Sequence, residues 1–216
     1  MSKIIHFFLD LLFPVSCLHC GLPGRYLCKD GWANFRLQLT HPAILREVQY
    51  CDKVFVRETS HHFLLTTLIH YFKYRYITDL SFYIAPLLIE QLTEMGVSNI
   101  DVVVSVPLSK KRLRWRGYNQ SEILAQAIGQ HFGWPVNTND LIRKVHTRPQ
   151  VGLNAQQRQK NVKGIFGLKD FTPFDGKNIL LVDDVLTTGA TLSQCAKMLK
   201  LAGAAEVYGL VLTTSG

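Results

Sequence analysis

The sequence of 216 residues lacks the long apolar run that a membrane-spanning helix requires. Its N-terminal apolar stretch, residues 4–15, is interrupted by His6 and Asp10 and is too short to cross a bilayer. An A-x-A-like cleavage site is also missing, so the stretch does not resemble a secretory signal peptide. We therefore expect a cytoplasmic protein, in which residues 4–15 form an amphipathic helix that packs on the neighbouring segment or touches the inner-membrane surface.

Acidic residues are scarce: 16 Asp and Glu stand against 24 Lys and Arg, which gives a formal net charge of +8. This surplus fits a polyanionic ligand, a phosphorylated substrate or nucleic acid, and charge alone does not choose among them. Internal repeats and low-complexity stretches are missing too. With 47% hydrophobic residues, the chain is expected to fold as one domain of enzyme size with a small appendage.

Cysteine is used sparingly, and three of the five cysteines stand close together near the N-terminus. Their spacing is close to that of tetrahedral zinc sites, but a complete second pair would place a cysteine at position 31, where this chain has Gly31. The candidate Zn²⁺ ligands are Cys17, Cys20, Cys28 and, from a distance, Cys51. Weaker substitutes for the fourth ligand are Asp30, His19 and His41. The alternative is a set of reduced thiols without metal.

The most informative segment is residues 178–191, NILLVDDVLTTGAT. Its first five residues have the near-continuous apolar character of a parallel strand buried on both faces. Asp183 and Asp184 follow where such a strand leaves the sheet, and ligands of open α/β sheets bind at strand ends. We expect the two carboxylates to accept hydrogen bonds from ribose hydroxyls and to hold Mg²⁺ through water.

The residues after the two aspartates predict a turn that opens a helix. The unpaired N–H groups and the positive dipole end of that helix can hold a phosphate, and Gly189 lets the backbone approach closely. The predicted phosphate-binding residues are Thr187, Thr188, Gly189, Ala190 and Thr191. The alternative is an acidic strand end followed by an ordinary helix start, but strand, acidic pair, Thr-Gly-x-Thr turn and helix in this order are more specific.

This segment closely resembles the phosphoribosyl pyrophosphate (PRPP) signature of type I phosphoribosyltransferases. The resemblance implies an α/β fold, in which a parallel sheet is flanked by helices, with PRPP as ligand and Mg²⁺ as its cofactor. It also implies that Asp183 and Asp184 are the catalytic carboxylates. In purine-specific relatives an aspartate at the position of Thr187 contacts or deprotonates the base, so its absence argues against purine transfer.

A basic run, KKRLRWR, follows the strand-like residues 101–107. In the fold that the resemblance implies, the loop after the first sheet strand meets pyrophosphate, through its backbone and the charges that follow. The residues assigned to that role are Ser105, Val106, Pro107, Leu108, Lys110, Arg112 and Arg116. A solvated basic face or a nucleic-acid patch is the competing interpretation.

Residues 141–166 contain six Lys or Arg and no Asp or Glu, with Pro149, Gly152 and Gly164 breaking regular structure. This composition is typical of a mobile loop that closes over a bound diphosphate and excludes water. The lid residues would be Arg143, Arg148, Arg158 and Lys160. Composition alone leaves a solvated basic connector as an equal alternative. The position of the segment between the predicted pyrophosphate loop and the predicted phosphate loop favours the lid.

Helical spacing of apolar residues predicts helices over 61–73, 80–95 and 120–132, with Pro86 kinking or splitting the second. Asn119 is the expected N-cap of the third helix. Trp115 and Tyr118 could stack on a base or sugar, although an aromatic beside a sheet usually covers apolar surface.

Over nearly its whole length the chain resembles the competence protein F (ComF) family, which includes GntX-type proteins. The matching residues are RGYNQSEILAQ, then Gln150, Leu153, Arg158, Asn161, Val162 and Phe166, then VDDVLTTGAT, and at the start FLDLLFPVSCLHCG. The resemblance places Lys73 near the phosphoribosyl site. It implies a zinc knuckle and a helix in residues 1–50 and a phosphoribosyltransferase-like domain in residues 51–216.

Many members of that family act in DNA uptake during natural transformation. The implied partners are PRPP, single-stranded DNA and a helicase or channel component of the uptake machinery. Three functional hypotheses remain. The first is a phosphoribosyltransferase, and the second is a non-catalytic module that binds PRPP, DNA or a partner protein. The third is a plain zinc-dependent DNA-binding protein, which would explain the basic charge but not the phosphate loop.

Overall fold

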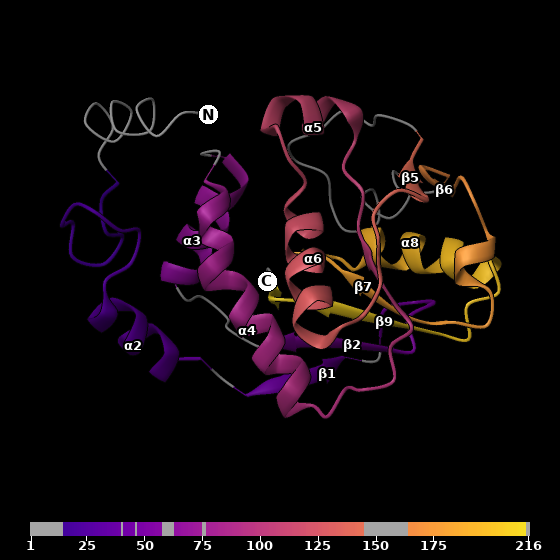
Figure 1. Ribbon diagram of the computed structural model, residues 1–216, viewed down its shortest axis with the longest axis horizontal. Coiled ribbons are helices and arrows are strands. Elements are labelled where there is room, and N and C mark those ends of the chain that lie inside the picture. The colour runs from indigo at the N-terminus through magenta and orange to yellow at the C-terminus, as the bar shows by residue number, and fades with distance from the viewer. Residues whose placement is uncertain are drawn as a thin grey trace.

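A computed structural model of the chain describes residues 15–39, 41–45, 47–57, 63–74, 77–144 and 164–214. The predicted N-terminal helix over residues 4–15 lies almost entirely outside the described residues, and so do Arg148, Arg158 and Lys160 of the predicted lid. Within the described ranges, the chain folds into a mostly parallel sheet with helices on both faces (Figure 1). The predicted α/β class is therefore confirmed.

The central sheet has six strands in the order β1-β2-β9-β7-β3-β4. Every neighbouring pair is parallel except β1 and β2, which are antiparallel. The strands are β1 (Pro42–Leu45), β2 (Lys53–Arg57), β3 (Val102–Ser105), β4 (Val136–Asn137), β7 (Asn178–Val182) and β9 (Glu206–Val211). The predicted boundary between an N-terminal subdomain, 1–50, and a second domain, 51–216, does not separate the strands. β1 lies in the first range, yet it pairs with β2 and forms an edge strand of the sheet of the second.

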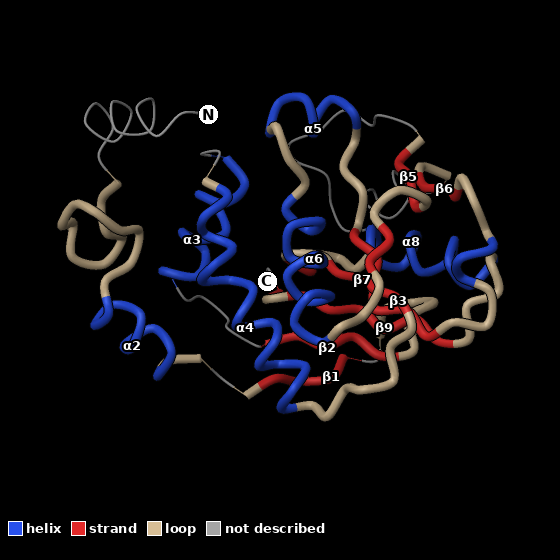
Figure 2. Tube along the Cα trace, viewed as in Figure 1, coloured by secondary structure: helices blue, strands red, loops and turns tan. Residues whose placement is uncertain are grey.

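The apolar strand residues 179–182 alternate between two cores, as expected of a strand covered on both faces. Leu180 and Val182 pack with the helices α3 (Phe63–Tyr74), α4 (Ser81–Glu94) and α6 (Gln120–Phe132). Ile179 and Leu181 pack on the opposite face with α8 (Ala190–Leu201). The two helical layers on either side of the strands are visible in Figure 2. Pro86 does not split α4, which runs continuously through it.

Shorter elements complete the described structure. The ribbon formed by β5 (Leu141–Arg143) and β6 (Phe166–Leu168) packs against α8, and β8 (Val185–Leu186) pairs with β10 (Thr213–Thr214). α5 (Lys110–Arg116) follows the loop after β3. Two 3₁₀ turns span Thr78–Leu80 and Thr172–Phe174. Among the described residues, no helix is both long and apolar enough to cross a membrane.

The N-terminal segment is attached to α4 through its own helix, α2 (Lys29–Leu37). The ring of Trp32 meets the ring of Tyr83 edge-on, with 5.5 Å between centroids, and the Tyr83 hydroxyl donates to the carbonyl of Leu27 over 3.4 Å. Arg36 and Glu90 add an ion pair of 2.9 Å. The cysteine-bearing loop therefore has a fixed place on the helical layer.

Strand order locates the ligand-binding edge of the sheet. From β3 the chain moves outward to β4, whereas from β7 it moves the other way to β9, so the connections diverge between β3 and β7. In open α/β sheets, ligands bind in the crevice at the carboxyl ends of the two strands where the connections diverge. Ser105 and Val182 are paired at those two ends, so the loops after them lie side by side.

Candidate functional site

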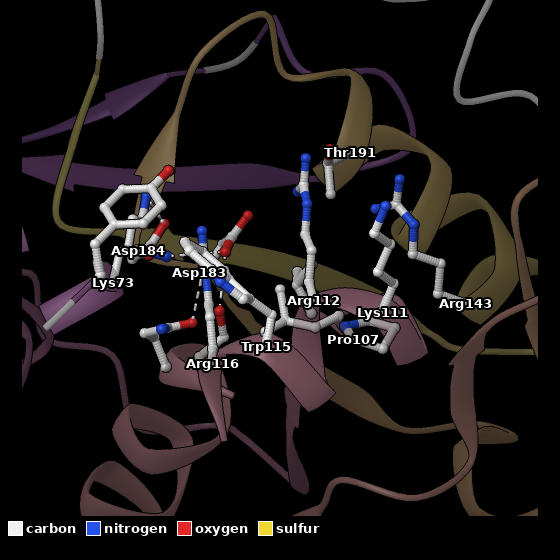
Figure 3. A pocket seen from close by; sticks show the side chains of 15 residues that line it. Lys73, Pro107, Lys111, Arg112, Trp115, Arg116, Arg143, Asp183, Asp184 and Thr191 are labelled. Carbon is white, nitrogen blue, oxygen red and sulfur yellow. Dashed lines mark hydrogen bonds and ion pairs between the residues drawn. The ribbon is translucent and has the colours of Figure 1, made fainter. Parts of the chain in front are cut away.

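Asp183 and Asp184 stand at the carboxyl end of β7 and are held by side chains from two helices, α3 and α6, and by one backbone N–H of their own. The Ser121 hydroxyl of α6 donates to Asp183 Oδ1 over 2.9 Å, and the Asp184 N–H donates to the same oxygen over 3.0 Å. Lys73 Nζ of α3 lies 2.8 Å from Asp184 Oδ1. Figure 3 shows this group at one side of a cavity. Two carboxylates are therefore ordered by one cation and two hydrogen-bond donors.

The pKa of Asp183 is raised to about 7 at this edge of the sheet. Burial is the largest cause, and the negative charge of Asp184 adds to it. Lys73 and the hydrogen bonds from Ser121 and the Asp184 N–H act in the opposite direction. A ligand that brings positive charge to this edge, such as a Mg²⁺ complex, would favour the ionised form.

The start of α6 fixes α3 beside the aspartates. The Gln120 amide donates to the Phe72 carbonyl over 3.3 Å, and the Tyr118 hydroxyl donates to the same carbonyl. Because Lys73 follows Phe72, these hydrogen bonds fix the backbone position from which the Lys73 side chain extends to Asp184. Tyr118 also packs on the ring of Phe72, so of the two predictions for this aromatic the apolar-covering role is confirmed.

Asn119 precedes α6 at the predicted N-cap position, but its side chain does not cap the helix. Its amide instead donates to the Val106 carbonyl over 3.1 Å and holds the loop after β3. α6 therefore begins without a side-chain cap. The preceding helix, α5, does have one, because the Ser109 hydroxyl accepts from the Arg112 N–H over 3.2 Å.

A cavity of about 420 Å³ opens beside the aspartates, between the loop after β3 and the start of α8. Its lining combines both carboxylates with five cations, Lys73, Lys111, Arg112, Arg116 and Arg143. In Figure 3, Lys111, Arg112 and Arg143 lie together on the side away from Lys73. Burial lowers the pKa of Arg143, and the nearby charge of Arg112 lowers it further. Cations gathered in this way create a positive potential that attracts anions.

The predicted phosphate loop is divided between two hollows. Thr191 lines the large cavity, whereas Thr188, Gly189 and Ala190 line a hollow of about 150 Å³ beside residues 47–49. Gly189 has a φ of +71°, as the predicted close turn requires, and α8 begins directly after it without a side-chain cap. Thr187 is exposed. The lining of the small hollow, taken over the described residues, includes Glu47 and no Lys or Arg.

The predicted pyrophosphate residues are similarly divided. Val106, Pro107, Leu108, Arg112 and Arg116 line the large cavity, Ser105 is buried beneath it, and Lys110 faces a separate hollow of about 480 Å³. Arg143 is the described lid residue that reaches the large cavity. The assignments from sequence omitted Lys111, Gln120 and Ser121, although Gln120 and Ser121 are polar residues in the first turn of α6, beside the predicted N-cap Asn119.

Two exposed aromatic rings stand at the mouth of the cavity. Trp115 is 54% exposed and Tyr74 is 43% exposed, and their centroids are 5.7 Å apart. The guanidinium of Arg116 lies over the Tyr74 ring at 4.9 Å. Planar groups of a ligand can stack on such rings.

The three N-terminal cysteines form a second candidate site. The Sγ atoms of Cys17, Cys20 and Cys28 lie within 4.8 Å of one another, and all three thiols are free. The N–H groups of Cys28 and His19 donate to Cys17 Sγ over 3.1 and 3.4 Å. Burial raises the pKa of the Cys17 thiol, but hydrogen bonds from the backbone outweigh burial and lower it to about 6. Soft thiolates held this close fit Zn²⁺.

Cys51, the proposed distant ligand, is not part of this cluster. It packs against the hydrophobic core on the α8 side of the sheet.

A family model described as "Phosphoribosyl transferase domain" matches residues 81–214, which include α6, β7 and the start of α8. The chain also resembles a purine phosphoribosyltransferase from Pyrococcus horikoshii, with 20% identity and a TM-score of 0.38 over 60% of this chain and 69% of that chain. The family match defines the class as a phosphoribosyltransferase-type domain.

Two curated relatives narrow the family. The "DNA utilization protein YhgH" of Salmonella typhimurium is 33% identical over 147 residues, 66% of this chain and 64% of that protein. "Competence protein F" of Haemophilus influenzae is 39% identical over 114 residues, 51% of this chain and 49% of that protein. The chain belongs to the ComF family. The matched part spans less than two thirds of the length of these relatives.

Proposed function

We propose that the chain binds PRPP with Mg²⁺ in the large cavity and serves DNA uptake from the cytoplasmic side of the inner membrane. The observation that carries the proposal is the meeting of two strand-end carboxylates with five cations in one cavity of about 420 Å³. That volume lies within the range of roughly 300–1,000 Å³ typical of small-molecule sites. Names of the relatives, "DNA utilization protein" and "Competence protein F", support the cellular role.

In this proposal each part of the ligand meets a different wall. Asp183 and Asp184 accept hydrogen bonds from the ribose hydroxyls, and Mg²⁺ is held through its water ligands. The diphosphate lies towards Arg112 and Arg143, where the cations gather. The 5-phosphate lies at the start of α8, near Thr191, where the helix has no side-chain cap and its first N–H groups can bind an anion.

Transfer chemistry would break the bond between the anomeric carbon and the diphosphate oxygen, which leaves with the bonding electron pair. An acceptor nucleophile then forms the new bond to that carbon. The protein would act by positioning and by stabilising the departing negative charge, and Arg112 and Arg143, which line the cavity, would supply guanidinium groups for it. Among the described residues the structure assigns no acceptor base.

We also propose that the N-terminal cluster binds Zn²⁺ through Cys17, Cys20 and Cys28. Three thiolates with Sγ atoms within 4.8 Å of one another present most of a tetrahedral zinc site. The metal would tie the loop between Cys17 and Cys28 to the start of α2, and through α2 to α4. Its expected role is structural, because the cluster lies on a different element from the aspartates.

Calorimetric titration with PRPP and Mg²⁺ tests the main proposal. The Asp183→Asn/Asp184→Asn double variant removes both charged acceptors. Hydrogen bonds to charged groups contribute about 1.5–3 kcal/mol each, so the affinity should fall by about 100-fold or more. The matched control is Asp79→Asn, an exposed aspartate outside the cavity, which should bind as the wild type does. Undiminished binding by the double variant would place the ligand elsewhere, and folded wild type that binds no PRPP would refute the proposal.

A second candidate function is the non-catalytic binding of single-stranded DNA, with a helicase or channel component as the partner that presents the strand. The exposed rings of Trp115 and Tyr74 beside the basic helix α5 favour it, because bases stack on aromatic rings while cations follow the phosphates. DNA binding should weaken steeply with salt and survive the double aspartate substitution, whereas PRPP binding should be lost in that variant.

A further inference from the structure

The zinc proposal leaves the fourth ligand open, because position 31 carries no side chain. His19 lies next to the gap. Its Nδ1 is 3.6 Å from Cys28 Sγ. Ligands on a tetrahedral zinc ion, with a Zn–S bond of about 2.3 Å and a Zn–N bond of about 2.1 Å, stand about 3.6 Å apart. The imidazole and the Cys28 thiol are thus already separated as two ligands of one ion would be.

Gly31 makes this placement possible. A Cβ atom added at position 31 would come within 2.6 Å of His19 Cβ and 2.7 Å of His19 Cγ. Contacts that short do not occur, so a side chain at position 31 and the His19 ring in this position exclude each other. The absence of a side chain at position 31 therefore leaves the space that the His19 ring occupies, and the histidine can replace the missing cysteine.

The surrounding backbone is also arranged around these atoms. The Gly31 N–H donates to Cys28 Sγ over 3.3 Å, and the His19 N–H donates to Cys17 Sγ over 3.4 Å. N–H groups that point at sulfur stabilise thiolates and fix the direction of their lone pairs. His19 is exposed and is not among the three residues whose ligand atoms all lie within 4.8 Å of one another. To complete the site, its ring would turn towards Cys17 and Cys20.

Cys51, another candidate for the fourth ligand, is less suited to bind the metal than His19. It packs against the hydrophobic core that α8 shares with the sheet, and burial raises the pKa of its thiol to about 12. The thiolate is the form that binds a metal, so burial makes Cys51 a poor ligand. Moving Cys51 to the N-terminal cluster would also pull the start of β2 away from β9, to which Lys53 is paired.

We propose that His19 supplies the fourth ligand of a Cys₃His zinc site, in place of a cysteine at position 31. This inference rests on the proposal that the cluster binds zinc. Coordination through Nδ1 gives the site one negative charge less than four thiolates would. Binding displaces the remaining thiol protons into solvent, and the metal undergoes no redox change.

X-ray absorption at the zinc edge tests the ligand set in the full-length, reduced, zinc-loaded protein. We expect one zinc per chain, a first shell of three sulfurs and one nitrogen, and the outer-shell scattering of a single imidazole. His19→Ala should lose the imidazole signal and weaken zinc binding by at least about tenfold in competition with a chromophoric chelator, because even loss of an outer-shell partner commonly has that effect. His19→Cys should restore affinity with a four-sulfur shell.

The matched control is Cys51→Ser, which should change neither the spectrum nor the affinity. An unchanged imidazole signal and affinity in His19→Ala, or loss of zinc in Cys51→Ser, would overturn the His19 assignment while the zinc proposal stands. Reduced wild-type protein that binds no zinc would overturn both. Circular dichroism of each variant separates a lost ligand from a lost fold.

Discussion

Replacement of Asp183 by asparagine should make the protein gain stability relative to the wild type as the pH rises. The raised pKa of Asp183, about 7, lies above the ordinary value of 3.8, so the fold favours the protonated carboxyl. The resulting contribution to stability is fully present below about pH 4 and is lost as the pH rises through about 7. The asparagine side chain of the variant would not titrate, and it still offers an oxygen to the Ser121 hydroxyl.

The magnitude follows from the pKa. Each unit corresponds to about 1.4 kcal/mol, so a rise from 3.8 to about 7 sets an upper limit of about 4 kcal/mol. About two thirds of that change falls between pH 5 and pH 8, and partial contact of the side chain with solvent reduces it further. We therefore expect the stability of Asp183→Asn relative to the wild type to increase by about 1–3 kcal/mol over this range.

Urea denaturation at pH 5, 6, 7 and 8 measures the difference, with the exposed Asp79→Asn as control. In the control, the difference from the wild type should stay constant. A constant difference for Asp183→Asn as well, or a difference that falls with pH, would refute the placement of Asp183 beside a second carboxylate in a partly desolvated edge of the sheet.

Three further predictions concern the site and the fold. Lys73→Met removes the cation 2.8 Å from Asp184 and should destabilise the protein by about 3 kcal/mol at pH 8 and by less at pH 5, measured by urea denaturation. Equal losses at both pH values would contradict the electrostatic interaction between Lys73 and the two carboxylates. Arg112→Gln should weaken binding of inorganic pyrophosphate by about tenfold or more in calorimetry, whereas Arg114→Gln, exposed on the same helix, should not; equal effects would indicate general charge attraction. Gly129→Ala should destabilise the protein by about 1–3 kcal/mol, because the new Cβ would lie 2.2 Å from Val136 Cγ2 and 2.8 Å from the Trp134 carbonyl oxygen; an unchanged melting temperature would contradict this packing.

Local sequence patterns predicted the elements that carry the site. The nearly continuous apolar run at 178–182 indicated a buried strand, and the aspartates after it were therefore expected at the end of that strand. The turn at Gly189 followed from the same segment, since a positive φ there needs glycine. These features depend on neighbours in the sequence, and the structure has them where they were expected.

Other features depend on how distant segments meet. The pairing of Lys73 with Asp184 requires α3 to dock against α6, a contact made through the Phe72 carbonyl that no side-chain pattern reveals. Residues 47–49 lie beside the phosphate loop because β1 joins the sheet edge, which the sequence did not indicate. Asn119 is a residue type that commonly caps helices, yet its side-chain amide donates to the carbonyl of Val106, thirteen residues earlier.

The most direct test of the proposed ligand site is a crystal structure of the protein with PRPP and Mg²⁺ at saturating concentration. We expect the ribose hydroxyls within hydrogen-bond distance of Asp183 and Asp184, and the diphosphate beside Arg112 and Arg143. PRPP bound away from this cavity, or an empty cavity in crystals that expose it to solvent, would contradict the account.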